Sequence, residues 1–333
     1  MFKLKEKVLN TIKKYNLIND GDKLVLGVSG GPDSISMLNI LNELRNDKNL
    51  HMNFDIIVAH VNHLIREEAI DDENFVRDFC KKINVKFYSK RINIPQIAEE
   101  KKIGEEEAGR YERYKFFDEI MEQEHANKIA IAHNKNDKIE TIIMNVLRGS
   151  GISGLVGIEP IKDNKIIRPL IECERNEIEE YCKKENIIPR IDRTNFENIY
   201  TRNKIRNIVI PYIKNEFNPN IIETMSRLSD LVKEEDKYLE KITILRYKEM
   251  YTSCENNKIS LDLKKFNKED KVIKSRILLY TISKLFGTTK GIEKIHIEDL
   301  IKLCENNIGN KYLTPNKHLK VLVKNHEINF YKI

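Results

Sequence analysis

The chain has 333 residues, of which 40% are hydrophobic and 33% are charged, and its formal net charge is +6. This length is sufficient for about two domains with buried cores, and the composition is that of ordinary globular proteins. This composition excludes a largely disordered or collagen-like chain. No apolar run approaches the roughly 20 residues of a membrane span.

The N-terminal residues predict an amphipathic helix that ends near Leu17. Lysines and Glu6 interrupt its apolar positions, which argues against a signal peptide. The five cysteines are scattered, and no two of them have the C-x-x-C spacing of a zinc or redox site. The sequence therefore predicts reduced thiols in a cytoplasmic protein.

The first strand–loop–helix unit is predicted at residues 24–41. An apolar run leads into Ser29-Gly30-Gly31-Pro32-Asp33-Ser34, and apolar residues at helical spacing follow at once. Glycines let backbone amides approach a ligand closely, and the N-terminus of a helix favours anions. The loop therefore predicts a phosphate site, although the serines of a tight turn can also simply cap a helix.

Further strands alternate with helices up to residue 185. The strands are expected at 55–61, 85–88, 128–132 and 166–170, and the helices at 67–82, 105–124, 137–147 and 175–185, with a further short helix that begins at Pro95. This alternation predicts an α/β fold with a doubly wound, mostly parallel sheet. Because ligands of such sheets bind beyond the carboxyl ends of the strands, Ser29, His60 and His133 should meet in one crevice.

The pattern changes near Asn218. A long amphipathic helix is expected from about Ile222, then helices near 268–286 and 294–305 and strands at 319–323 and 328–331. We therefore predict a catalytic domain at 1–215 and a second, mainly helical domain at 216–333 that ends in a small β element. Residues 258–333 carry 16 Lys and Arg against 8 Asp and Glu, which favours a polyanion partner, although a lysine-rich proteome would explain this excess equally well.

Several polar segments follow the predicted strands in a fixed order. They are His60-Val61-Asn62-His63 with Arg66; Glu106, Ala108, Arg110, Arg113 and Tyr114; Ala132-His133 with Asp137, Glu140 and Thr141; Leu147-Arg148-Gly149-Ser150-Gly151; Arg168-Pro169-Leu170; Asp192 with Thr194-Asn195; and Tyr200 to Arg206, closing at Pro211. The Ser-Gly-Gly-Pro-Asp-Ser loop resembles the PP-loop of the ATP pyrophosphatase superfamily. With the ordered segments, residues 20–215 resemble the tRNA(Ile)-lysidine synthetase family, which residues 216–333 resemble in architecture only.

The resemblance implies a two-step reaction. ATP adenylates carbon 2 of the wobble cytidine in a CAU-anticodon tRNA(Ile), with release of pyrophosphate, and the ε-amine of free L-lysine then displaces AMP. The implied cosubstrate is ATP with Mg²⁺, the implied partners are this tRNA and lysine, no membrane is involved, and a homodimer is compatible with the sequence.

The resemblance also implies roles for three acids. Asp33, at the start of a helix beside a triphosphate, is expected to hold Mg²⁺, although an acid there also satisfies the helix dipole. Asp137 and Glu140 lie three residues apart and project from one helical face, where they suit a metal, with Asp137 as its ligand, or the charged groups of lysine. The alternative for this pair is a solvated acidic face opposite Lys135 and Lys138.

Two further sets of candidates follow from the resemblance. The residues implied to bind ATP are Ser29, Gly30, Gly31, Pro32, Asp33, Ser34, His60, Arg148 and Gly149. The arginines implied to meet tRNA or other phosphates, for which a planar guanidinium is well suited, are Arg110, Arg113, Arg202 and Arg206. Some of these arginines could instead be surface residues or partners of Glu106 and Asp192.

The chain also departs from the family. Where the family usually has His-His-x-Asp-Asp, this sequence has His133-Asn134-Lys135-Asn136-Asp137, so Asn134 and Asn136 replace a histidine and an acid. The main alternative function is another PP-loop enzyme of tRNA, a thiolase. Thiolases need catalytic cysteines or a metal cluster, and none of the five cysteines falls on a motif.

Overall fold

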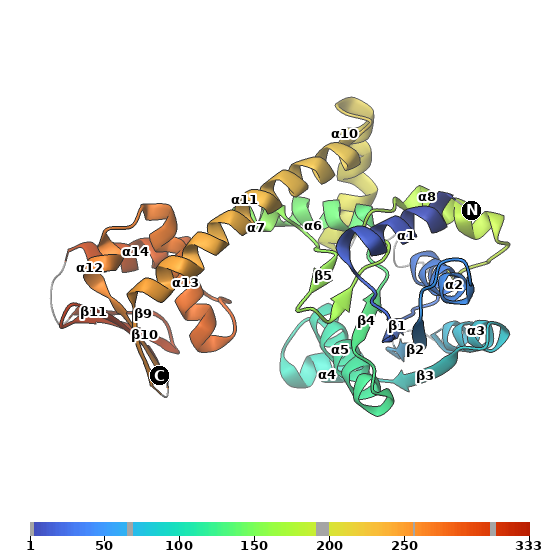
Figure 1. Cartoon of the computed structure of the whole chain (residues 1–333), viewed down its shortest axis with the longest axis horizontal. Helices are drawn as coiled ribbons and strands as arrows, with labels where there is room; N and C mark the ends of the chain where they lie inside the picture. Colours follow the sequence, from blue (N-terminus) through green and yellow to red (C-terminus); the bar gives the residue numbers. More distant parts are fainter. Residues whose placement is uncertain (1–2, 65–68, 191–199, 256, 307–310) are drawn as a thin grey trace. The chain divides into compact units, whose positions relative to one another are not determined.

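The computed structural model describes residues 3–64, 69–190, 200–255, 257–306 and 311–333, so Arg66, Asp192, Thr194 and Asn195 lie outside the described residues. The chain forms two compact units, Met1–Asp230 and Leu231–Ile333. We expected the boundary at 215, whereas the units divide within the helix α11 (Ile221–Met250; Figure 1). The first turns of α11 therefore belong to the first unit.

The first unit contains a six-stranded sheet with the strand order β3-β2-β1-β4-β6-β5. Strands β1 (Asp22–Gly27), β2 (Phe54–Asn62), β3 (Lys86–Arg91), β4 (Lys128–Ile131) and β6 (Ile166–Ile167) are parallel, and β5 (Ile161–Lys162) is antiparallel to β6. This confirms the predicted doubly wound, mostly parallel sheet. The strand expected at 166–170 is only two residues long, because Pro169 has no amide to continue the ladder.

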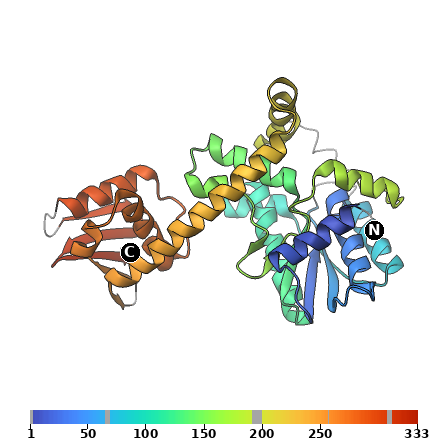
Figure 2. The same cartoon turned by 45° about the horizontal axis from the view of Figure 1, so that its top comes forward.

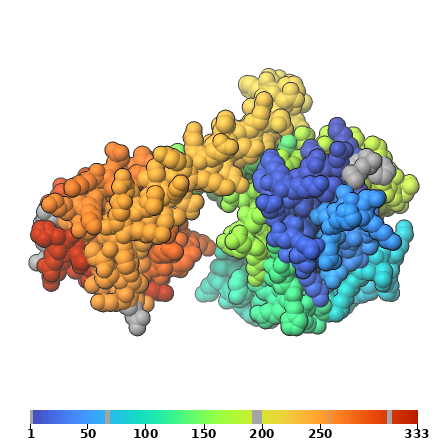
Figure 3. All heavy atoms as spheres, in the orientation of Figure 1, coloured from blue at the N-terminus to red at the C-terminus, as the bar shows by residue number. Residues whose placement is uncertain are grey.

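Apolar residues alternate between the two faces of this sheet, which explains why both faces are covered. Leu24 and Leu26 of β1 belong to one core cluster, and Val25 belongs to the other. The first face packs against α1 (Lys3–Tyr15), α2 (Pro32–Asn46), α3 (Ala69–Lys82) and α8 (Arg175–Lys184), and the second packs against α5 (Glu105–Glu124). Figure 3 shows α1 lying on the outside of this unit, next to α2.

The remaining helices of the first unit are short, except for α6, which follows β4. They are α4 (Ile94–Lys101), α6 (Lys135–Leu147), α7 (Ile152–Leu155), α9 (Thr201–Lys204), a π-helical turn (Ile205–Val209) and α10 (Ile210–Glu216). Apolar residues of α6, the π-helical turn, α10 and the start of α11 form one cluster that includes Ile139, Ile205 and Ile222. This cluster fixes α6, which carries Asp137 and Glu140, against the residues around Arg206.

The second unit contains a five-stranded antiparallel sheet with the order β7-β8-β11-β10-β9. The strands are β7 (Tyr251–Glu255), β8 (Lys258–Asp262), β9 (Lys311–Asn316), β10 (Leu319–Lys324) and β11 (Glu327–Lys332). The helices α12 (Leu263–Asn267), α13 (Lys271–Phe286) and α14 (Lys294–Glu305) pack against it (Figure 2). We predicted only β10 and β11. The edge strands β7 and β9 have largely exposed, polar positions without the alternation of a half-buried strand, and β8 was missed as well, although its central residues are buried.

Within the described part of the chain, the structure contains no helix with the length and apolar character needed to span a membrane.

A buried carboxylate, Glu73 of α3, connects this helix to the ends of β2 and β3. It is 2% exposed and accepts hydrogen bonds from Arg77 (2.6 Å), Arg91 (2.8 Å), Ser89 (2.9 Å) and Asn62 (3.4 Å). Burial alone would raise the pKa of Glu73, but the hydrogen bonds from Arg91, Ser89 and Asn62 outweigh this and lower the pKa to about 2.

We therefore predict a pH-dependent contribution of Glu73 to stability. Because the folded pKa lies below the usual value of 4.5, this contribution is complete above pH 4.5 and is lost as the pH falls toward 2. Urea unfolding of Glu73→Gln should show a lower free energy of unfolding than wild type at pH 7, and the difference should shrink on acidification. Asp78→Asn, an exposed acid on the same helix, is the control, and a pH-independent difference for Glu73→Gln would contradict the prediction.

Candidate active site

The phosphate loop is closed by one serine hydroxyl. Ser34 Oγ accepts hydrogen bonds from the amides of Ser29 and Gly30, both at 3.2 Å, and donates to the Gly31 carbonyl at 3.0 Å. Gly30 has φ +96°, a conformation that favours glycine. Gly31 is the N-cap of α2 and provides no side-chain cap. The first amides of α2 therefore remain available to an anion, together with the positive end of the helix dipole.

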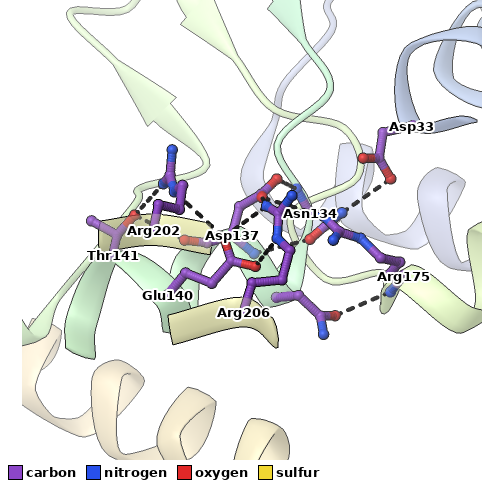
Figure 4. Close-up of polar contacts among 9 residues, drawn as sticks. Asp33, Asn134, Asp137, Glu140, Thr141, Arg175, Arg202 and Arg206 are labelled. Atoms are coloured by element: carbon purple, nitrogen blue, oxygen red, sulfur yellow. Dashed lines mark hydrogen bonds and ion pairs between the residues drawn. The ribbon is translucent and has the colours of Figure 1, made fainter. Parts of the chain in front are cut away.

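Asp33, in the first turn of α2, points toward the start of α6 (Figure 4). Its Oδ1 accepts a hydrogen bond from Asn134 Nδ2 at 3.0 Å. Burial and the negative charge of Asp137 raise the pKa of Asp33 to about 6, and Arg175 opposes this shift. The two acids thus lie close enough to repel one another, which favours a cation between them.

Asp137 and Glu140 are both paired with arginines. Arg206 donates to Glu140 from Nε at 2.6 Å and from Nη2 at 2.7 Å, and its Nη2 also donates to Asp137 at 3.0 Å. Arg175 approaches Asp137 at 3.6 Å, and Arg202 approaches Glu140 at 3.4 Å (Figure 4). The site is therefore a network of alternating charges, and not two free carboxylates.

The alternative of a solvated acidic face is wrong. Glu140 is 1% exposed, and Lys135 and Lys138 are also buried. The two lysines form ion pairs with Glu223 (2.7 Å) and Asp230 (3.0 Å) at the start of α11. Charged side chains on both faces of α6 thus form ion pairs within the first unit.

Three histidines near the ends of β2 and β4 are neutral at pH 7. His60 Nδ1 lies 2.9 Å from the Val28 carbonyl, and burial lowers its pKa. Burial also lowers the pKa of His133 to about 4, and burial with the charge of Arg113 does the same for His63. Because Arg168 Nε donates to His133 Nδ1 at 3.2 Å, the His133 proton resides on Nε2. His133 can therefore act as a hydrogen-bond donor but not as a cation.

The four predicted phosphate-binding arginines fall into two groups. Arg202 forms an ion pair with Glu140, and Arg206 forms ion pairs with Glu140 and Asp137, so carboxylates of α6 and not phosphates are their partners in this structure. Arg113 and Arg110 are exposed on α5, where Arg113 contacts His63 at 3.2 Å and Arg110 lies over the Tyr114 ring at 5.2 Å.

Arg148 and Gly149, predicted to bind ATP, are exposed at the far end of α6. Eleven residues separate Arg148 from Asp137, which corresponds to about 16 Å along a helix axis. The structure thus groups the loop residues, Asp33, Asp137 and Glu140, and it separates Arg148 and Gly149 from them.

Two residues of the network were not predicted, Asn134 and Arg175. Asn134 is fully buried and is the N-cap of α6, since its Oδ1 accepts from the Asp137 amide at 3.0 Å while the Asp137 side chain accepts from the Asn134 amide at 3.1 Å. The pattern Asn-x-x-Asp before an apolar helix is a visible capping signal. Arg175 comes close to Asp137 only because α8 packs beside α2 on the first face of the sheet, which no local pattern reveals.

Asn134 gives a prediction that separates its two hydrogen bonds. Asn134→Ser keeps an N-cap oxygen but loses the donor to Asp33, so we expect near wild-type stability and about a tenfold lower kcat. Asn134→Ala loses both bonds, and its free energy of unfolding should in addition be about 1 kcal/mol lower than that of wild type. Steady-state kinetics and urea unfolding of the two variants measure this, and unchanged turnover in Asn134→Ser would show that the bond to Asp33 is dispensable.

Comparison with known proteins gives a consistent result. A family profile described as the PP-loop domain matches residues 2–213. The tRNA(Ile)-lysidine synthase of Clostridioides difficile (strain 630) is 44% identical over 98% of this chain and 72% of that protein, and that of Clostridium acetobutylicum is 46% identical over 93% of this chain and 66% of that protein. The chain thus spans about two thirds of the length of these relatives.

The fold also occurs in solved structures of other proteins. The U34-tRNA thiolase from Methanococcus maripaludis, which carries a [4Fe-4S] cluster, aligns with a TM-score of 0.54 and 19% identity over 69% of this chain and 78% of its own. At this identity the likeness concerns the fold alone.

Proposed function

The chain belongs to the tRNA(Ile)-lysidine synthase family, and we propose that it attaches lysine to carbon 2 of the wobble cytidine of a CAU-anticodon tRNA(Ile). ATP first adenylates the cytidine with release of pyrophosphate, and the lysine ε-amine then displaces AMP. The observation that carries this proposal is the meeting of the uncapped start of α2 with Asp33, Asp137 and Glu140. A phosphate site and a carboxylate site for an amine are therefore neighbours.

The phosphate loop binds the triphosphate in this proposal. The free amides at the start of α2 and the Ser29 hydroxyl bind the β- and γ-phosphates. This placement presents the α-phosphate toward Asp33. Attack by the cytidine oxygen at the α-phosphate then expels pyrophosphate, which stays bound at the helix N-terminus.

Mg²⁺ fits the acids at this position. Asp33 and Asp137 supply hard oxygen ligands, and the repulsion that raises the pKa of Asp33 is relieved by a cation. Mg²⁺ usually takes one or two carboxylates and completes its shell with phosphates and water, so two acids are sufficient. When bound, the ion would neutralise phosphate charge, and the protein contributes the orientation of the two carboxylates through Asn134.

Lysine is the proposed amine, and Asp137 and Glu140 are the acids that attract its ammonium groups. The ε-ammonium has no lone pair, so it must lose a proton before it attacks the adenylated base. A carboxylate of this pair attracts the cation and accepts that proton. The fork of Arg175 or Arg206 suits the α-carboxylate of lysine, which distinguishes lysine from a simple diamine.

The cysteines argue against the thiolase alternative. Cys80, Cys173, Cys182 and Cys304 are buried, and burial raises the thiol pKa of Cys80, Cys173 and Cys304 to about 12. A thiol with such a pKa is inert at neutral pH. Cys254, the exposed one, lies in β7 of the second unit. We also propose a cytoplasmic location, because the substrates of the proposed reaction occur there.

The function is tested by AMP formation from ATP with purified protein. We predict that AMP appears with pyrophosphate only when a CAU transcript of tRNA(Ile) is present, and that lysine is needed for release of AMP from the RNA. The second unit, with its basic C-terminal part, should add affinity for the tRNA that falls with salt. AMP formation without tRNA, or sulfur transfer to the tRNA, would contradict the proposal.

A further inference from the structure

The outer side of α11 carries an apolar stripe within the second unit. Leu231, Tyr238 and Leu245 follow one another at intervals of seven residues, and they are 63%, 65% and 52% exposed. Because seven residues make about two helical turns, the three side chains lie on one face of the helix. Leu239 and Thr243 lie on the inner side, where Leu239 packs against the core of this unit and Thr243 is buried. The helix therefore uses one face for its own core and exposes a row of apolar side chains on the other, which is typical of an interaction surface.

Two charged residues lie between the apolar ones on the exposed face. Glu234 precedes Tyr238 by four residues, Lys241 follows it by three, and both side chains are exposed. Among the described residues neither of them forms an ion pair, although Asp236 and Arg246 of the same helix do. Along the helix the exposed face therefore reads Leu, Glu, Tyr, Lys, Leu.

This order is complementary to itself when a second copy of the helix runs in the opposite direction. With the two Tyr238 rings at a twofold axis, Leu231 lies opposite Leu245 of the second copy. Glu234 then lies within one residue, about 1.5 Å along the axis, of the level of Lys241 of the second copy. The twofold axis repeats both contacts, as in an isologous interface. Parallel helices would instead place equal charges at the same level, which is unfavourable.

We propose that this face of α11 binds the same face of a second copy of the chain in antiparallel orientation. Burial of the leucine and tyrosine side chains supplies the affinity, and the two Glu–Lys pairs fix the direction and register. The face extends over about 21 Å of helix, since each residue adds about 1.5 Å. Such a contact is small beside those of permanent dimers, which bury about 2,000 Å² or more, so the dimer should dissociate on dilution. The inference is independent of the proposed reaction.

Sedimentation velocity of the full chain between about 1 and about 100 µM tests the proposal, and wild type should change from monomer to dimer over this range. Glu234→Lys puts like charges at both contacts and should weaken the dimer by about tenfold or more, and Lys241→Glu should do the same. The double variant Glu234→Lys with Lys241→Glu again has opposite charges at both contacts, so it should recover the dissociation constant of wild type. Tyr238→Ala should weaken the dimer without recovery.

A matched control is Lys264→Glu, which reverses an exposed charge on α12 and should leave the dissociation constant unchanged. A double variant as weak as the single variants would overturn the antiparallel pairing, and a dimer that no charge reversal on α11 affects would show that the copies meet elsewhere. A wild-type chain that stays monomeric throughout, but whose affinity for tRNA falls in Tyr238→Ala, would show that this face binds RNA and not a second copy.

Discussion

Asp33→Ala is expected to abolish ATP-dependent turnover, by about 10³-fold or more, while leaving the fold intact. Asp33 lies at the phosphate loop, where a triphosphate must be aligned for attack at its α-phosphate, and Asn134 holds its carboxylate in place. Its side chain is not part of the apolar core. Pyrophosphate release measures the loss, and circular dichroism shows that the variant is folded.

The pH dependence of kcat/KM for ATP gives a second test of the role of Asp33. Because burial and Asp137 raise the pKa of Asp33 to about 6, kcat/KM for ATP should fall as the pH decreases below about 6. Asp33→Asn keeps the shape but not the charge and should be as inactive as Asp33→Ala. Asp20→Ala, which changes an exposed turn residue, is the control, and near-normal turnover in either Asp33 variant would remove Asp33 from the mechanism.

Arg206→Leu is expected to lower the free energy of unfolding by about 3 kcal/mol, the typical effect of breaking a buried ion pair. Arg206 makes three hydrogen bonds to Asp137 and Glu140, and Glu140 is only 1% exposed. Without Arg206, the carboxylate of Glu140 remains buried with Arg202 at 3.4 Å as its nearest cation. Urea unfolding measures this loss.

A double variant shows whether the loss comes from the ion pair. Arg206→Leu with Glu140→Leu removes both charges and should be more stable than the sum of the two single effects predicts. Arg148→Leu, at the exposed end of the same helix, should stay within about 0.5 kcal/mol of wild type. If the effects of the two single substitutions simply add, the pair is not coupled.

The sequence was sufficient for the parts of the fold that follow from local pattern. The apolar strands predicted the parallel sheet, because burial on both faces leaves near-continuous apolar runs. The phosphate site at the glycine loop stays a prediction. The larger sheet of the second unit was missed, since the edge strands β7 and β9 depend on pairing with β8 and β10 and not on their own alternation.

The three acids of the candidate site could be named from the sequence, but Asn134, Arg175 and the pairing of the charges could not. Asp33, Asp137 and Glu140 could be named from the loop and from their helical spacing. That Arg206 neutralises Glu140 could not, because 66 residues separate them and the contact depends on how the π-helical turn packs on α6. The same holds for Asn134, whose capping pattern is local but whose bond to Asp33 joins two strand ends.

The most direct test of the account is the transfer of labelled lysine to three transcripts: tRNA(Ile) with the anticodon CAU, the same tRNA with UAU, and a methionine tRNA with CAU. A loop base can be turned out and read on its polar edge, and adenylation needs a carbonyl oxygen at position 2 beside an N3 without a proton, which cytidine has and uridine lacks. The account predicts that label enters only the first transcript. Label in all three, or in none while AMP is still formed, would contradict it.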